Sequence, residues 1–154
     1  TKNGKILRLI EDNKIAWHAG KSYWGKYKNL NKNSIGIELV NKGHRFGYTS
    51  FGKKQLLSLT RLCKNLINKY KIKKQNVVGH SDIAPLRKID PGEKFPWKFL
   101  AKKNIGVLIQ CECEDFKYSL ATGQLIDKTT EPKKYYPLLN YPVKKIGSNL
   151  IISN

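Results

Sequence analysis

The stretch that decides the fold is VVGHSDIAPLRKIDPGEKFPW, residues 77–97. It opens with a short β-branched run that favours a strand, and this strand delivers His80 at its end. The prolines and the glycine that follow exclude regular structure, so we expect a loop over residues 81–96. A polar loop at the end of a buried strand is a common place for a functional site.

This loop carries the residue types of a metal centre. His80 and Asp90 stand ten positions apart, and a catalytic zinc ion usually takes three ligands such as these and leaves a fourth position to water. Lys88 or Arg87 would then stand beside the metal, where a cation stabilises the oxyanion of an attacked amide. The spacing also arises by chance, so by itself it permits a zinc site without establishing one.

The flanking sequence predicts alternating strands and helices. Residues 5–10 and 34–40 read as strands, residues 21–33 as a surface loop, and residues 97–103 as a closing helix. Between residues 50 and 70 apolar side chains recur every three or four positions, which predicts an amphipathic helix capped by Ser50 with Cys63 on its buried face.

Glu38 lies within the apolar string IGIEL, where burying a carboxylate is costly unless it is paired or functional. It is a candidate general base for activating a water molecule. The alternative is a structural ion pair with one of the many lysines.

The formal net charge of +19 would suit a polyanion partner, but lysine is spread through nearly every segment. With no nucleic-acid-binding motif, we expect a solvated basic surface and no nucleic acid partner. No apolar run is long enough for a transmembrane segment. Cys111 and Cys113 would point the same way on a strand, but without a second pair nearby a metal role is disfavoured.

Four motifs follow one another in order: AWHAG at 16–20, LNKNSIGIEL at 30–39, NKYKI at 68–72, and the stretch at 77–97. Together they resemble the N-acetylmuramoyl-L-alanine amidases of the type 2 amidase family, which are related to phage lysozyme-type amidases and animal peptidoglycan recognition proteins. The resemblance runs from about Gly4 to about Gly106. It implies an α/β fold with a central mixed sheet flanked by helices.

The resemblance also implies a function and a set of catalytic residues. The expected reaction is zinc-dependent hydrolysis of the amide between N-acetylmuramic acid and L-alanine in peptidoglycan or its fragments. His80 and Asp90 match two zinc ligands of the family, Glu38 matches the acid that activates water, and Lys88 matches the basic residue near the oxyanion.

Three further residues are implied to contact the substrate. Arg87 would contact a substrate carboxylate, while His18 and Trp24 would lie at the rim of the substrate groove. The string AWHAGKSYWG, residues 16–25, resembles the envelope amidases, so the cell envelope or periplasm is favoured over the cytoplasm.

The chain departs from the family pattern at its N-terminal side. The family's first zinc ligand is a His on an early central strand, and this chain has no His before His18. Three explanations stay open: the chain is a fragment of a longer protein, it is a degenerate relative that has lost activity, or another residue supplies the missing ligand. The rival function is a peptidoglycan-binding module that does not hydrolyse peptidoglycan. We expect a partial amidase domain over residues 1–108, without the family's first strand, and a C-terminal extension of uncertain order over 109–154. The missing strand would expose two sheet edges unless the tail after Gly106 fills the gap.

Overall fold

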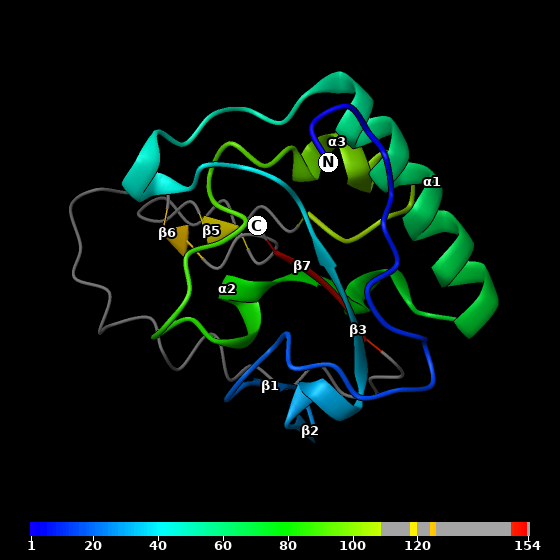
Figure 1. The fold of residues 1–154 in the computed structure, drawn as a ribbon. Helices are drawn as coiled ribbons and strands as arrows, with labels where there is room; N and C mark the ends of the chain where they lie inside the picture. The colour runs from blue at the N-terminus through cyan, green and yellow to red at the C-terminus, as the bar shows by residue number, and fades with distance from the viewer. Residues whose placement is uncertain (109–117, 120–123, 126–148, 154) are drawn as a thin grey trace.

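The computed structural model describes residues 1–108, 118–119, 124–125 and 149–153, and Figure 1 shows their arrangement. Strands lie at the centre with helices beside them, which confirms the α/β class. The cysteines at 111 and 113 lie outside the described residues, as does most of the predicted extension.

The central sheet consists of three parallel strands. These are β3 (Ser34–Glu38), β7 (Asn149–Ser153) and β4 (Val77–Gly79), in the order β3-β7-β4. In the register, Glu38 pairs with Ser153 on one side of β7, and Gly79 pairs with Ile152 on the other. All three strands therefore end at the same edge of the sheet.

The middle strand of this sheet comes from the C-terminal end of the described chain. β7 pairs with β3 over five residues and with β4 over three, and Ile152 is fully buried. β7 thus lies between β3 and β4, in the gap that the tail after Gly106 was suggested to fill. The domain boundary at 108/109 stays a prediction, since β7 belongs to the same sheet as β3 and β4.

The sheet is covered on both faces by apolar side chains. On one face Val77 and Ile152 join a large cluster with Leu59 and Leu66 of α1 (Lys53–Tyr70) and with Leu100 of α3 (Trp97–Ala101). On the other face Val78 joins a smaller cluster that includes Ala19, Leu30 and Ile83. The loop that contains AWHAG thus packs directly against the face of β4 that points away from α1 and α3.

The predicted long helix is α1, and its apolar period is confirmed. Cys63 is fully buried within it, and burial raises the pKa of this thiol to about 12. The predicted cap at Ser50 is wrong, because the helix begins at Lys53 with Gly52 as its N-cap. Gln55 explains the shift: its Oε1 accepts from the Gly52 N–H at 3.1 Å, and its Nε2 donates to the Val40 carbonyl at 2.9 Å.

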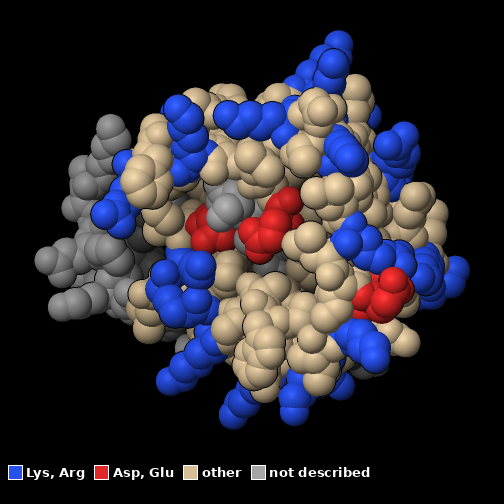
Figure 2. Space-filling model, viewed as in Figure 1, with Lys and Arg blue, Asp and Glu red and all other residues tan. Residues whose placement is uncertain are grey.

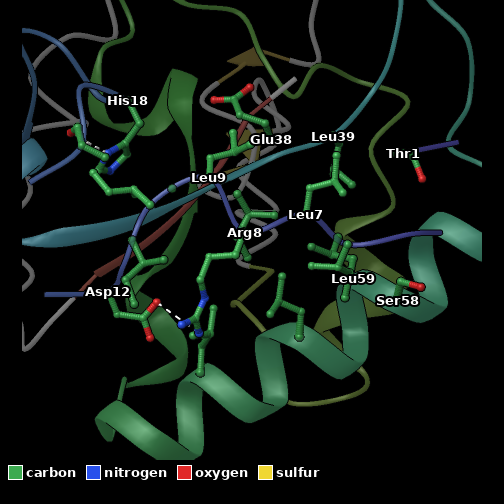
Figure 3. A pocket seen from close by; sticks show the side chains of 18 of the residues that line it. Thr1, Leu7, Arg8, Leu9, Asp12, His18, Glu38, Leu39, Ser58 and Leu59 are labelled. Atoms are coloured by element: carbon green, nitrogen blue, oxygen red, sulfur yellow. Dashed lines mark hydrogen bonds and ion pairs between the residues drawn. The ribbon is translucent and has the colours of Figure 1, made fainter. Parts of the chain in front are cut away.

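The predicted strand over residues 5–10 is not formed. This segment runs beside β3 without pairing to it, and a cavity of about 480 Å³ separates the two. Figure 3 shows Leu7, Leu9, Leu39 and Leu59 among the side chains that line this cavity. A strand needs a partner for its backbone hydrogen bonds, and among the described residues β3 pairs with β7 and not with this segment.

Short elements complete the described chain. The expected loop over 21–33 contains a two-stranded hairpin and a 3₁₀ turn. The expected loop over 81–96 is wrong at its start, because residues 81–83 belong to a single helical turn. The short elements are β1 (Tyr23–Trp24), β2 (Tyr27–Lys28), η1 (Leu30–Lys32), η2 (His44–Phe46), η3 (Lys74–Asn76), α2 (His80–Ile83), β5 (Tyr118–Ser119) and β6 (Gln124–Leu125).

The charged residues agree with a solvated basic surface. On the face shown in Figure 2, Lys and Arg side chains surround a small number of acidic side chains and cover no single patch. Within the described part of the chain, no helix combines the length and the apolar character needed to cross a membrane.

Candidate active site

The site lies where the parallel strands end. Glu38 is the last residue of β3, and His80 directly follows β4. With β7 between them, the two backbones are separated by two strand spacings, about 10 Å. Ligands bind at the carboxyl ends of strands in open α/β sheets, so this edge is where the predicted residues should gather.

His80 and Asp90 are brought together by the turn and the loop that follow β4. The Gly79 N–H donates to Asp82 Oδ2 at 2.7 Å and fixes the start of α2. The Ser81 N–H donates to the Asp90 carbonyl at 2.8 Å and closes the loop. As a result His80 Nδ1 lies 3.1 Å from Asp90 Oδ2, and only 4% of the His80 surface is exposed.

This pair has the geometry of two ligands of one ion. Zn²⁺ binds nitrogen and carboxylate oxygen at about 2.0–2.2 Å, which in a tetrahedral site puts the two donor atoms about 3.3 Å apart. The observed 3.1 Å fits that separation. In the described residues no third His, Cys, Asp or Glu joins the pair to form a group of three, so the fit covers two ligands.

Lys88 and His80 act on the ionisation of Asp90. Burial opposes the charged form and is the largest single influence, but the hydrogen bond from His80 and the positive charges of His80 and Lys88 outweigh it. The pKa of Asp90 is therefore lowered below its ordinary value. Asp90 is accordingly a charged carboxylate at neutral pH, as a metal ligand requires.

The other nitrogen of His80 faces a backbone carbonyl. His80 Nε2 lies 3.2 Å from the Ala19 carbonyl oxygen, and Arg87 Nη2 donates to the same oxygen at 2.7 Å. Arg87 also donates to the Lys21 carbonyl at 3.1 Å. The guanidinium predicted to contact substrate thus ties the AWHAG loop to the loop after β4, and its role with substrate stays a prediction.

His18 packs flat against the start of β3. A Cβ on Gly36 would lie 2.6 Å from His18 Cδ2, so only glycine leaves room for the ring there. His18 Nδ1 donates to the Ala16 carbonyl at 2.9 Å, and Nε2 lies 2.9 Å from Ser34 Oγ. Burial lowers the pKa of His18 and outweighs the hydrogen bond to the Ala16 carbonyl, which raises it. The lowered pKa favours a neutral ring.

Glu38 is exposed on β3, so the expectation that it is buried among apolar residues is wrong. Alternation explains this, since Ile37 and Leu39 take the two buried positions on either side of it. Glu38 lies at the end of the cavity near His18 (Figure 3), and its charge raises the pKa of His18 by a small amount. The carboxylate therefore faces solvent at the edge of the sheet where the strands end.

Trp24 lies in β1, beside α2. It packs against the smaller apolar cluster, and its Nε1 is buried without a hydrogen-bond partner among the described residues. Its predicted contact with substrate is not tested by this arrangement.

Two supporting residues had no signal in the sequence pattern. Asn31 Oδ1 accepts the backbone N–H groups of His18, Ala19 and Gly20 at 3.1, 2.8 and 3.3 Å. It is one of three alternating asparagines in a polar loop, and only its burial, with 5% of its surface exposed, separates it from the others.

Tyr48 is the second such residue. Its hydroxyl donates to the Pro91 carbonyl at 2.6 Å and accepts from the Lys94 N–H at 3.1 Å. The neighbouring His44 is exposed, and its Nε2 lies 2.8 Å from a Glu93 carboxylate oxygen. Residues 44–48 therefore hold the loop that follows Asp90.

Comparisons with known proteins agree with this geometry. The N-acetylmuramoyl-L-alanine amidase family matches residues 1–93. The N-acetylmuramoyl-L-alanine amidase AmiD of Escherichia coli is 46% identical over 111 residues, which cover 68% of this chain and 40% of AmiD. The 1,6-anhydro-N-acetylmuramyl-L-alanine amidase AmpD of Haemophilus influenzae is 40% identical over 98 residues, covering 63% of this chain and 51% of AmpD.

The fold agrees as well. A solved structure of E. coli AmiD in complex with the substrate anhydro-N-acetylmuramic acid-L-Ala-D-γ-Glu-L-Lys superposes with a TM-score of 0.65 at 42% identity, covering 70% of this chain and 44% of that one. The chain thus spans about half, or less, of the length of these relatives. The family match, residues 1–93, covers more than half of the chain and includes Glu38, His80 and Asp90. The chain belongs to the N-acetylmuramoyl-L-alanine amidase family.

Proposed function

We propose that this protein hydrolyses the amide bond between N-acetylmuramic acid and L-alanine in peptidoglycan or its fragments, with zinc as cofactor. The observation that carries the proposal is the 3.1 Å approach of His80 Nδ1 to Asp90 Oδ2, with His80 Nε2 turned to the Ala19 carbonyl. A histidine that ligates a metal usually donates its other N–H to such a carbonyl. Membership of the N-acetylmuramoyl-L-alanine amidase family supports the choice of this amide bond as the one that is cleaved.

His80 Nδ1 and Asp90 Oδ2 would hold the metal. Zinc at this position supplies a Lewis acid that polarises the amide carbonyl and acidifies water. The two protein atoms keep their separation because the Ser81–Asp90 backbone hydrogen bond and the Tyr48–Pro91 hydrogen bond fix both ends of the loop.

Glu38 would act as the general base. It is exposed at the sheet edge, about 10 Å from the His80 backbone, which leaves room for a water molecule and the amide between the two side chains. Its carboxylate would take a proton from the water as the carbonyl is attacked and pass it to the leaving nitrogen. Lys88, whose charge already reaches Asp90, would stabilise the oxyanion.

His18, Trp24 and Arg87 would form the wall that receives the muropeptide. They come from the AWHAG loop, β1 and the loop after α2, and Arg87 joins the last of these to the Ala19 and Lys21 carbonyls. The resemblance of residues 16–25 to the envelope amidases supports action in the cell envelope or periplasm.

The test uses the anhydro-muramyl tripeptide on which AmiD acts. The protein is dialysed against chelator, its zinc affinity is measured by calorimetry, and release of the tripeptide is followed by mass spectrometry with and without zinc. We expect zinc-dependent cleavage, lost in Glu38→Gln with zinc binding retained. Cleavage that persists without any metal would overturn the zinc requirement, and tight muropeptide binding without cleavage would establish the rival binding module.

A further inference from the structure

We infer that Arg87 is a positioning residue of the active site, because its guanidinium fixes the AWHAG loop against the backbone turn that carries Lys88. This role differs from the expected contact with a substrate carboxylate, since it acts through the protein's own backbone. The inference rests on the proposed function for its effect on turnover, whereas the contact between the loop and Arg87 belongs to the free protein.

The first observation is a bridge between two segments that lie far apart in the sequence. Arg87 Nη2 donates to the Ala19 carbonyl at 2.7 Å and to the Lys21 carbonyl at 3.1 Å. Ala19 is fully buried, so its carbonyl depends on donors within the protein. Hydrogen bonds from a charged donor are stronger than those between neutral groups. Arg87 therefore holds the loop on both sides of Gly20.

Gly20 allows the guanidinium to come this close. A Cβ on Gly20 would lie 3.0 Å from Arg87 Nη2 and 3.3 Å from Cζ, and the backbone there has a φ of +61°. The guanidinium thus packs against the backbone of a residue that has no side chain. Two carbonyls and the glycine between them make up the contact.

These hydrogen bonds occupy the forks with which a guanidinium grips a carboxylate. Such a grip uses two parallel N–H groups, either of Nη1 and Nη2 or of Nε and Nη2. Both forks therefore need a proton of Nη2. Nη2 has two protons, and in Arg87 it donates two hydrogen bonds to the loop. A substrate carboxylate bound in the bidentate mode would have to displace a backbone carbonyl.

The other end of Arg87 is held by a closed backbone turn. The Arg87 N–H donates to the Ala84 carbonyl at 3.0 Å, and the Lys88 N–H donates to the same oxygen at 2.9 Å. The Ala84 N–H in turn donates to the His80 carbonyl at 3.0 Å. Lys88 therefore shares a fixed turn with Arg87, and the Arg87 side chain sets the distance from this turn to the AWHAG loop. A displacement of about 1 Å in an active site can lower the rate about 100-fold.

The experiment compares Arg87→Ala and Arg87→Lys with wild type. Arg61→Ala, which removes an exposed arginine from α1, is the matched control. Lysine keeps the positive charge but has no planar fork. Hydrogen–deuterium exchange, followed by NMR in metal-free protein without substrate, reads the amides of residues 18–22.

Turnover is the second measurement. In zinc-loaded protein, kcat and KM are determined for the anhydro-muramyl tripeptide and for the same compound with its carboxylates converted to carboxamides. A residue that positions the loop affects both substrates alike, whereas a residue that binds a substrate carboxylate affects only the first.

We expect amide exchange over residues 18–22 to be about 10-fold faster in both Arg87 variants and unchanged in Arg61→Ala. We expect kcat to fall about 10- to 100-fold for both substrates, with KM little changed. Arg87→Lys should behave as Arg87→Ala does, because one ammonium group does not reproduce the planar bridge between two carbonyls.

Exchange at the wild-type rate in Arg87→Ala would overturn the inference. A loss of turnover confined to the substrate with free carboxylates, and restored by lysine, would also overturn it and would establish a substrate contact instead. Because exchange is read without metal or substrate, a wild-type protein that cleaves neither compound would count against the proposed function alone.

Discussion

His80 and Asp90, ten positions apart in the sequence, meet side chain to side chain with 3.1 Å between Nδ1 and Oδ2. Replacing Asp90 with Asn removes the negative charge of this pair while preserving its shape. We expect the zinc dissociation constant of Asp90→Asn to rise at least tenfold, an order-of-magnitude expectation for the loss of a charged ligand, as measured by chelator competition.

Glu93→Gln is the matched control, since Glu93 lies on the same loop but faces His44. Equal losses of zinc affinity in both variants would show that the loop, rather than the Asp90 carboxylate, is responsible.

Tyr48→Phe should destabilise the protein. The substitution keeps the ring but leaves the Pro91 carbonyl and the Lys94 N–H without their partner. Leaving a buried group unpaired costs about 1–3 kcal/mol, so the urea midpoint should fall. Tyr23→Phe, an exposed tyrosine in β1, provides the comparison. A midpoint equal to that of Tyr23→Phe would mean that the loop is held by other contacts.

Ile152→Ala should cost about 2–5 kcal/mol, because it opens a cavity at a fully buried position in the middle strand of the sheet. Chemical denaturation measures the loss, with Ile89→Ala as control, since 54% of Ile89 is exposed. Similar, small effects of both substitutions would contradict the placement of β7 between β3 and β4.

Asp12 should make the protein lose stability in acid. Its carboxylate accepts from Tyr70 at 2.6 Å and from Lys69 at 2.9 Å, and these hydrogen bonds, the one from Tyr70 first, lower its pKa below the ordinary 3.8. As pH falls, the unfolded chain therefore binds the proton first. The contribution of Asp12 is complete above pH 3.8 and is lost as pH falls through the lower, folded pKa.

The measurement is the free energy of unfolding of wild type and Asp12→Asn between pH 2 and pH 6. This range is chosen to bracket the ordinary pKa of an aspartate. We expect the gap between the two to close at the acid end of this range. A gap that stays constant would show that Asp12 acts through its shape rather than its charge.

Ser153→His tests the site from the opposite direction, by adding a ligand. Ser153 pairs in register with Glu38, and the residue before it pairs with Gly79, so position 153 lies between Glu38 and His80 along the sheet edge. An imidazole there should tighten zinc binding at least about tenfold, because catalytic zinc usually has three protein ligands. Ser153→Ala should leave zinc affinity as it is, and equal affinities in the two variants would contradict the placement.

Local patterns in the sequence predicted the helices and strands whose burial is decided by nearby residues. The apolar period of α1 and the short run before His80 are of this kind, and both are confirmed. The segment at 5–10 has the same alternation, but its strand pairing depends on a partner beside it, which no local pattern reveals.

The candidate site shows the same division. Residues 80, 88 and 90 could be proposed together because one loop carries them, and the structure places His80 and Asp90 in contact. Asn31 and Tyr48 could not be found this way, since each acts on a backbone far away in sequence. The exposure of Glu38 was likewise missed, because composition alone did not show which positions of IGIEL face the core.

The placement of β7 has a consequence for how the protein is made. Its residues are the last of the described chain to leave the ribosome, yet they form the middle of the sheet. Until they emerge, β3 and β4 face each other with unpaired inner edges, the kind of surface through which nascent chains associate. The active-site edge is therefore complete only after β7 has been synthesised and has inserted between β3 and β4, and the nascent chain needs protection until then.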